Sequence, residues 1–241
     1  MPQKINVLAF AAHPDDVEIS ISGIMIKHRI NGLKTGIVDL TKGELGTRGD
    51  EFIRAEESKK ASQILGLSAR QNLGIKDGFI TNSEENLISV VKMIRAFQPD
   101  IVLMNAESDR HPDHGKAHTL VKEACFLSGL IKLSTKYNEE IQEAWRPKSM
   151  YSYIQDYYLE PDILIDVSPL WNQRMEALLA YSSQFYNTES KELETPISSP
   201  AFMEHIKGRA IQWGRLINCG YAEGLRKVNH FSVNLLTDIL P

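Results

Sequence analysis

Residues 5–16 read INVLAFAAHPDD, an apolar run that ends at a histidine, a proline and two aspartates. Residues 5–11 are apolar apart from Asn6, which is typical of a strand buried on both faces of a parallel sheet. A second run of this kind, residues 101–104, precedes the cluster His111-Pro112-Asp113-His114. Open α/β sheets build their ligand sites at the carboxyl ends of their strands. The two segments therefore predict both a fold class and the place of a site.

The first two thirds of the chain alternates strand-like and helix-like segments. The spacing of apolar residues predicts helices and strands, which are, in chain order, helix 17–30, strand 35–40, helix 50–65, strand 71–74, helix 83–98, strand 101–104 and helix 115–131. Asp50 and Ser83 are typical helix N-caps, and Gly66 is a typical helix end. This alternation favours right-handed βαβ units and a mostly parallel, Rossmann-like sheet flanked by helices.

The last third of the chain is less regular. We expect strands at residues 149–154 and 163–167, and helices at 170–181 and 202–217. Residues 188–200 are polar and include two prolines, which indicates a surface loop or lid. Because no change in composition marks a boundary, we expect residues 1–241 to form a single α/β domain.

Composition restricts the partners. The net charge of -4 gives no electrostatic reason to expect a nucleic acid or an anionic membrane surface. The amino-terminal apolar run of about eight residues is too short for a signal sequence or a membrane span. Cys125 and Cys219 lie far apart and form no CxxC pair, so we expect reduced, buried thiols. These features predict a soluble, cytoplasmic protein without nucleic-acid or membrane partners.

The two polar clusters face one another if residues 101–104 lie beside residues 5–11 in the sheet. The loops after two such strands diverge and leave a crevice at the switch point of a doubly wound sheet. Two histidines and one carboxylate are a common ligand set for catalytic zinc, and the same set accepts iron(II). A metal-polarised water beside a carboxylate base is a hydrolytic nucleophile near neutral pH. The sequence therefore predicts a metal site at the switch point.

A capped turn is the alternative interpretation of each cluster. In a single His-Pro-Asp triplet the aspartate often accepts the amides of a helix N-terminus, and the proline fixes the backbone. Two such triplets, each at a strand end and each opening a helix, favour a shared metal site over two capped turns.

The string AHPDDVE at residues 12–18, with HPDHGKAH at residues 111–118, resembles the LmbE-like (PIG-L) zinc N-deacetylases of N-acetylglucosaminyl compounds. Other strings resemble the bacillithiol-biosynthesis branch of that family, whose enzymes deacetylate N-acetylglucosaminyl-malate. They are DLTKGELGTRG, FIRAEESKKASQILG, ESDRHPDHGKAH, RPKSMYSYI, AYSSQF and YAEG. The resemblance is spread along most of the chain and implies a zinc-dependent hydrolase that releases acetate from such a conjugate.

The resemblance implies which residues form the metal centre. The family pattern implies that His13, Asp16 and His114 are the zinc ligands. It implies that Asp15 is the general base that activates the attacking water. The chain departs from the pattern at residues 20–23, Ser-Ile-Ser-Gly, where related chains commonly carry a Gly-Gly pair. That position concerns helix packing, so the departure bears on the substrate more than on the metal.

The resemblance also implies residues that act on the substrate. His111 becomes the electrophilic or acid group near the acetyl oxygen, and Asp113 becomes its orienting partner. Arg54 and Arg110 match family arginines near the substrate, and either could clamp a sugar hydroxyl or a malate carboxylate.

Several alternatives stay open. Glu18 is either an anchor behind the ligands or an acid favoured by the helix dipole. His118 has ligand spacing from His114, but the resemblance favours a place behind the ligands. The substrate could also be another N-acetylglucosaminyl compound or a chitooligosaccharide, or the chain could be a non-catalytic nucleotide- or sugar-binding module. Related enzymes are often homo-oligomers, including hexamers.

Overall fold

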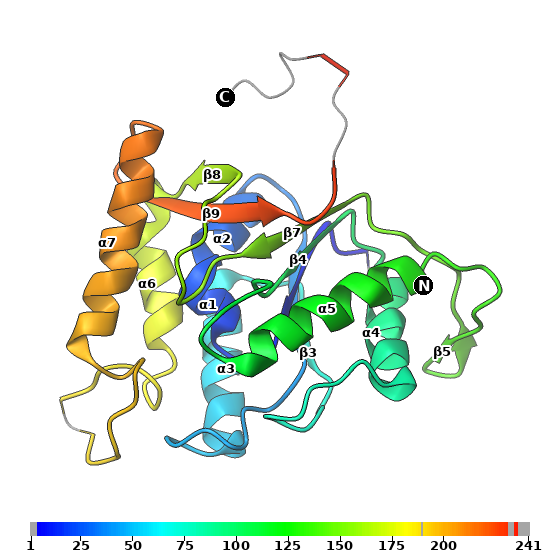
Figure 1. Cartoon of the computed structure of the whole chain (residues 1–241), viewed down its shortest axis with the longest axis horizontal. Helices are drawn as coiled ribbons and strands as arrows, with labels where there is room; N and C mark the ends of the chain where they lie inside the picture. Colours follow the sequence, from blue (N-terminus) through cyan, green and yellow to red (C-terminus); the bar gives the residue numbers. More distant parts are fainter. Residues whose placement is uncertain (1–3, 189, 231–233, 236–241) are drawn as a thin grey trace.

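β1 (Val7–Ala11) lies between two parallel neighbours, β2 (Thr35–Asp39) and β4 (Ile101–Met104), in a seven-stranded sheet. This is the strand order that places the two polar clusters together, and the prediction of a mostly parallel α/β sheet is confirmed. The computed structural model describes residues 4–188, 190–230 and 234–235, and Figure 1 shows the sheet between two groups of helices. The full strand order is β3-β2-β1-β4-β7-β9-β8.

The remaining strands extend the sheet on both sides. They are β3 (Ala69–Asn72), β7 (Ser149–Tyr153), β8 (Ile163–Asp166) and β9 (Ala222–Lys227), with a separate hairpin of β5 (Lys136–Tyr137) and β6 (Glu140–Ile141). The predicted strands 71–74, 149–154 and 163–167 are confirmed with small shifts of their ends. β9 was not predicted. It runs antiparallel between β7 and β8, and its sequence, AEGLRK, lacks the apolar run of a buried strand.

Alternate residues of β1 pack against different helices. Leu8 and Phe10 pack in the core formed with α4 (Glu84–Phe97) and α5 (Pro112–Leu127). Val7 and Ala9 pack in the core on the other face. The helices of that second face are α2 (Ser22–Ile30), α3 (Glu51–Leu65) and α6 (Trp171–Leu179), and α7 (Pro200–Leu216) packs near β9. Burial on both faces explains why residues 5–11 are almost continuously apolar.

The predicted helix ends are confirmed where a cap defines them. Asp50 Oδ1 accepts the backbone N–H groups of Phe52 and Ile53 at 2.9 and 2.8 Å, so α3 begins there. Gly66 ends α3 with a φ of 67°, a conformation that favours glycine. Ser83 Oγ accepts the N–H of Asn86 and caps α4.

The single helix predicted over residues 17–30 is wrong, because the chain breaks into α1 (Asp16–Ser20) and α2. Glu223, on β9, accepts the N–H groups of Gly23 and Ile24 at 3.0 and 2.7 Å and so caps α2. A Cβ atom on Gly23 would lie 2.8 Å from the Val167 side chain. Residues 20–23 therefore form a closely packed helix start.

The predicted start of the helix at residue 115 is also wrong. α5 begins at Pro112, with His111 as its N-cap residue. Proline is favoured in the first turn because its missing N–H would have no helical partner there. The second polar cluster is therefore the first turn of a helix, which holds its side chains on a rigid element.

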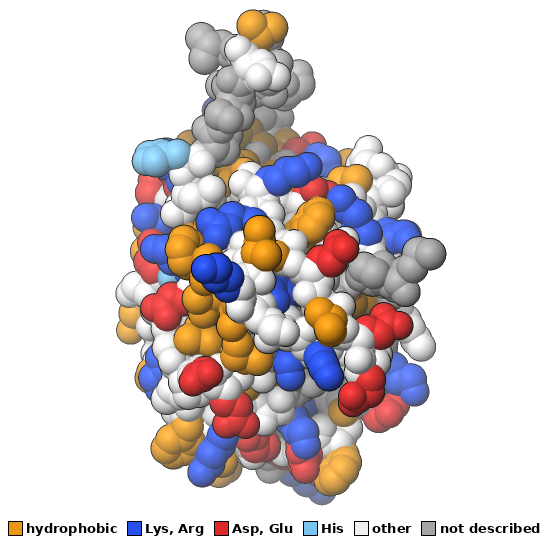
Figure 2. Space-filling model, turned by 90° about the vertical axis from the view of Figure 1, so that its right-hand side faces the viewer, with side chains coloured by type: hydrophobic (Ala, Val, Ile, Leu, Met, Phe, Trp, Pro, Cys, Tyr) orange, Lys and Arg blue, Asp and Glu red, His pale blue; other side chains and the backbone are white. Residues whose placement is uncertain are grey.

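The prediction of reduced, buried thiols is confirmed for one of the two cysteines. Both cysteines are free; Cys125 is buried as expected, whereas Cys219 is only partly buried. In the part of the chain that the structure describes, each helix is too short or too polar to cross a membrane. On the face shown in Figure 2, acidic and basic side chains are interspersed with hydrophobic ones.

Candidate active site

The carboxyl ends of β1 and β4 open into a cavity of about 380 Å³. The strands are parallel neighbours, with Val7 beside Ile101, as the sequence predicts. Seven of the eight predicted site residues line the cavity: His13, Asp15, Asp16, Arg54, Arg110, His111 and His114. The eighth, Asp113, is fully buried next to it. The two clusters therefore converge, and the capped-turn alternative does not account for their meeting.

Three imidazole rings meet in this cavity. The ring centroid of His13 lies 4.5 Å from that of His111 and 5.5 Å from that of His114. The rings of His111 and His114 are 5.3 Å apart. One nitrogen of each ring lies within 4.8 Å of the others, so the three histidines form a group that could hold a metal ion.

His13 and His114 are each oriented by a carboxylate that the sequence analysis did not identify. His13 Nε2 lies 3.0 Å from Asp77 Oδ1, and His114 Nδ1 lies 2.5 Å from Asp109 Oδ2. A carboxylate accepts only, so each of these ring nitrogens carries an N–H, and the other nitrogen is the one that can bind a metal once it has lost its proton. Histidines that bind metals are commonly fixed in this way. The signal that could have found Asp77 and Asp109 is their place in loops after β3 and β4.

Asp16, the third predicted ligand, lies beside two of these imidazoles. Its Oδ1 lies 3.3 Å from His114 Nε2, and its Oδ2 lies 3.8 Å from His13 Nδ1. Ligands of tetrahedral zinc, with bonds of about 2.0–2.1 Å, are about 3.3 Å apart. His114 Nε2 and Asp16 Oδ1 have this spacing, whereas the group of three histidines that could hold a metal joins His13 and His114 with His111 rather than with Asp16. A second group, His13 with Asp77 and Asp113, is also close enough for a metal, but it uses the His13 nitrogen that faces away from Asp16.

The electrostatics of the ligand set favour a cation. Burial lowers the pKa of His13, but hydrogen bonds and charges from Asp113, Asp77 and Asp16 outweigh it and raise that pKa to about 10. Burial also lowers the pKa of His114, yet Asp16 and Asp109 raise it to about 9. Conversely, burial raises the pKa of Asp16, and the two imidazoles bring it well below its usual range. A site that holds protons this strongly also favours a metal cation.

Asp15 occupies a strained and buried position beside the predicted ligands. Its φ is 117°, in the left-handed region that non-glycine residues rarely adopt. Arg54 Nη2 donates to Asp15 Oδ2 at 2.6 Å. Burial raises the pKa of Asp15, and Arg54 lowers it, with a result of about 7. A carboxylate with a pKa in this range is suited to general-base catalysis at neutral pH.

His111 and Asp113 adopt different roles from those of the other cluster residues. The backbone N–H of Asp113 donates to His111 Nδ1 at 3.2 Å, which leaves Nε2 to carry the proton of a neutral ring. Burial and the charges of His13 and His114 lower the pKa of His111. The Asp113 carboxylate instead accepts from Gly78 N at 2.7 Å and lies 3.8 Å from His13 Nε2. The expected Asp113–His111 contact is thus made by the backbone.

The cavity rim includes the second predicted arginine and part of the predicted lid. Arg110 Nε donates to Asp156, and the arginine is partly exposed. Thr195 and Ile197, from the polar segment 188–200, also line the cavity. Glu192 in that segment accepts from the N–H of Gly49 at 2.9 Å, which ties the segment to the loop after β2.

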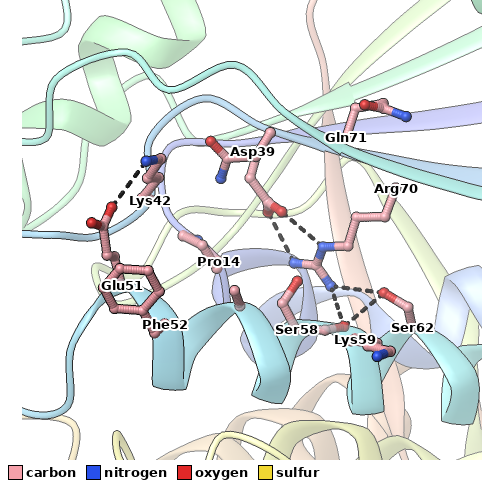
Figure 3. Close-up of a pocket in the computed structure, with 12 residues that line it drawn as sticks. Pro14, Asp39, Lys42, Glu51, Phe52, Ser58, Lys59, Ser62, Arg70 and Gln71 are labelled. Carbon is pink, nitrogen blue, oxygen red and sulfur yellow. Dashed lines mark hydrogen bonds and ion pairs between the residues drawn. The ribbon is translucent and has the colours of Figure 1, made fainter.

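The two residues left open by the sequence bond to groups other than the predicted ligands. Glu18 is fully buried and accepts from Arg70 Nη1 at 2.6 Å. His118 Nδ1 donates to the backbone carbonyl of Asn105 at 3.0 Å, and His118 lies outside both potential ligand groups in the described chain. Figure 3 shows a second cavity beside α3, in which Arg70 points toward Asp39 and α3. Among the described residues, those that line this second cavity include no histidine.

Comparison with known proteins agrees with this geometry. Residues 8–125 match the model of the PIG-L family, described as GlcNAc-PI de-N-acetylase. The chain is 28% identical over 233 residues to diacetylchitobiose deacetylase of Thermococcus kodakarensis, covering 92% of this chain and 83% of that one. It is also 28% identical over 202 residues to a probable N-acetyl-alpha-D-glucosaminyl L-malate deacetylase 2 of Bacillus anthracis, covering 77% of this chain and 84% of the relative.

Similarity to a solved structure extends over the whole fold. The conserved protein TT1542 of Thermus thermophilus matches with a TM-score of 0.84 and 32% sequence identity. The match covers 95% of this chain and 98% of TT1542. Both polar clusters lie within the matched family region, as do β4 and all of β1 except Val7. On these matches and on the converging histidine and aspartate clusters, the chain belongs to the PIG-L/LmbE-like deacetylase family.

Proposed function

We propose that the protein is a zinc-dependent hydrolase that removes the acetyl group from an N-acetylglucosaminyl conjugate, with N-acetylglucosaminyl-malate as its substrate. One observation carries the proposal. His13, Asp16 and His114 converge around a space that Asp15 also reaches, in a cavity large enough for a small ligand. Relatives named as deacetylases of diacetylchitobiose and of the malate conjugate support the substrate class.

The residues at the site divide the chemistry between them. When bound, a divalent metal supplies Lewis acidity that polarises water and the amide carbonyl. Asp15 accepts the proton of the attacking water, while Arg54 holds the carboxylate in place. The neutral His111 ring donates from Nε2 to the oxygen on which negative charge develops. As the C–N bond breaks, Asp15 returns the proton to the departing amine, and acetate is released.

The two arginines, Arg54 and Arg110, have different roles in this proposal. Arg54 acts mainly through Asp15, because its guanidinium already donates to that carboxylate. Arg110 lies at the rim, and its Nη atoms are suited to a carboxylate of the malate group. A chitooligosaccharide is the second candidate substrate, since the diacetylchitobiose deacetylase match covers 92% of the chain.

An amine-release assay tests the proposal. Purified protein is stripped with a chelator, reloaded with Zn²⁺ or Fe²⁺, and given N-acetylglucosaminyl-malate, diacetylchitobiose or free N-acetylglucosamine. We expect activity only in the metal-loaded protein and a clear preference for the malate conjugate. Equal rates on the conjugate and the free sugar would refute the malate assignment. No amine release from any of the three compounds, with or without metal, would support the non-catalytic binding module instead.

We propose further that the protein is a cytoplasmic homo-oligomer that acts on this small molecule alone. Large apolar side chains near the cavity rim support self-association, since Leu45 and Phe79 are 60% and 59% exposed. Sedimentation velocity tests the assembly, and a hexamer is the expected upper size. A monomer at micromolar concentration would contradict it.

A further inference from the structure

Two buried side-chain amides hold Asp16 from the ends of neighbouring strands. Asn105 directly follows β4, and Gln155 comes shortly after β7. Both are almost inaccessible, at 0% and 3% exposed. β4 and β7 are parallel and hydrogen-bonded, with Met104 beside Ser152. The amides therefore approach Asp16 from the same edge of the sheet that carries the histidine clusters.

A backbone group fixes the orientation of both amides. The N–H of Ala12 donates to Asn105 Oδ1 at 2.9 Å, so the other end of that amide is the donor. Asn105 Nδ2 donates to Asp16 Oδ2 at 2.9 Å and to Gln155 Oε1 at 2.8 Å. Gln155 must then present Nε2 to Asp16, and it donates to Oδ1 at 2.9 Å. Rotating either amide by 180° would place two acceptors in contact.

The two oxygens of Asp16 are used differently as a result. Oδ2 accepts from both Asn105 Nδ2 and the backbone N–H of His13, the latter at 2.9 Å. These two donors fill the lone-pair directions of Oδ2. Oδ1 accepts from Gln155 Nε2 and lies 3.3 Å from His114 Nε2, so it keeps a lone pair beside that ring nitrogen.

Each amide is itself held through its backbone carbonyl. His118 Nδ1 donates to the carbonyl of Asn105 at 3.0 Å. Arg209 Nη1 donates to the carbonyl of Gln155. Both donors are buried side chains, at 8% and 7% exposed. Asp16 is therefore connected through the amides to α5 and α7, which gives His118 a positioning role.

We propose that Asn105 and Gln155 are positioning residues of the metal site: they fix Asp16 as a ligand that acts through Oδ1 alone, and thereby set the metal affinity. The inference rests on the metal site of the proposed function. A carboxylate without these donors can rotate, so it loses conformational freedom when it binds the metal, and it can offer either oxygen or both. Partners that orient a metal ligand typically contribute 10–100-fold to affinity.

Gln155→Met tests the proposal, because it removes the donor to Oδ1 with little change in volume. We expect the Zn²⁺ affinity, measured by competition with a chromophoric chelator, to fall about 10–100-fold. The visible spectrum of the Co²⁺-loaded variant should also differ from that of the unmodified protein, since the carboxylate binds in a new mode. Gln184→Met is the matched control. Gln184 is a buried amide of the same cavity that donates to Arg48 O and Ser183 Oγ, and its loss should leave the Zn²⁺ affinity unchanged.

Gln155→Ala serves as a second variant that places no apolar group in the cavity, and the same loss is expected. Circular dichroism in the presence of chelator identifies which variants keep the fold, and affinity is measured on those. Zn²⁺ affinities within about twofold of the unmodified protein in a folded Gln155 variant would overturn the positioning role and leave the metal site standing. Unmodified protein that binds neither Zn²⁺ nor Fe²⁺ would overturn the proposed function itself.

Discussion

Arg54 donates a hydrogen bond of 2.6 Å to Asp15, and both side chains are buried beside the three imidazoles. The bond joins α3 to the loop after β1, and α1, α2, β2 and the loop after β2 lie between these two elements in the chain. Such a short contact between opposite charges restricts the proposed base to one rotamer. The position of Asp15 therefore depends on α3 as much as on its own loop.

Arg54→Met should lower kcat about 10²-fold and change KM little, because it misplaces the base without removing a group that binds the sugar. Arg54→Lys should lose less, since it keeps the charge and loses only the planar contact. Steady-state kinetics on the N-acetylglucosaminyl substrate separate the two parameters. If KM rises and kcat stays constant, Arg54 binds the substrate, as its resemblance to family arginines implies.

Gly43→Ala should disturb the hydrogen bond between Arg54 and Asp15, because Gly43 lies against the Arg54 guanidinium. Gly43 has a φ of 68°, and a Cβ atom there would lie 1.9 Å from Arg54 Nη1. The substitution should cost about 1 kcal/mol or more in unfolding free energy, because alanine is strained in this region. It should also lower kcat. Gly74→Ala is the control: its φ is 64°, with open space around the added atom, so stability should fall while kcat is retained.

Asp15→Gly and Asp15→Ala should both lower the deacetylation rate about 10²–10⁴-fold, because both remove the base. Both should also be less stable than the unmodified protein, since they leave the buried Arg54 guanidinium without its counter-charge. The φ of 117° strains an alanine by about 1–3 kcal/mol but not a glycine, so Asp15→Gly should be the more stable of the two. A thermal melt of each metal-free variant checks the order, and an Asp15→Gly melt at or below that of Asp15→Ala would contradict it.

The sequence predicts the centre of the site because strand ends are local features. The apolar runs 5–11 and 101–104 identify β1 and β4, and a parallel sheet brings the residues after them together. Asn105 and Gln155 escaped prediction because their role depends on a hydrogen-bond chain that links three loops. No periodicity in the sequence marks such a chain.

Long-range contacts explain the errors in the fold. The break between α1 and α2 depends on Glu223, which lies 200 residues from Gly23 along the chain. β9 is hard to recognise because its buried Glu223 and its partly buried Arg226 replace the expected apolar residues. Glu223 is accommodated by Arg174, at 3.2 Å, and by the amides of α2. Local patterns cannot indicate that a carboxylate will be buried with partners supplied by other elements.

Thiol reactivity should distinguish the two cysteines. Burial raises the pKa of Cys125 to about 12, and its side chain is 2% exposed. At pH 8 about one part in 10⁴ of such a thiol is the reactive thiolate, and reagents cannot reach it. Cys219 is only partly buried, so it should react first. Alkylation followed by mass spectrometry should find one modified site in the native protein and two in urea. Rapid modification of Cys125 in the native protein would contradict this burial.

Arg70→Met should destabilise the fold more than any surface substitution. Arg70 donates to both oxygens of Asp39, at 2.7 and 2.9 Å, and to Glu18 at 2.6 Å. Asp39 and Glu18 are 1% and 0% exposed, so removing the arginine leaves two buried carboxylates without a counter-charge. Breaking a buried ion pair from one side typically costs about 3–5 kcal/mol.

Urea unfolding of the metal-free protein measures this cost. Arg226→Met is the matched control, because Arg226 pairs with Glu107 at 3.0 Å where both side chains are about one third exposed. An exposed pair contributes about 0–1 kcal/mol, so the control should unfold at nearly the same urea concentration as the unmodified protein. Equal losses in the two variants would mean that water or protonation compensates Glu18 and Asp39. A larger loss for Arg70→Met would show that the ion pairs of Arg70 with Asp39 and Glu18 stabilise α1, the helix that begins with Asp16.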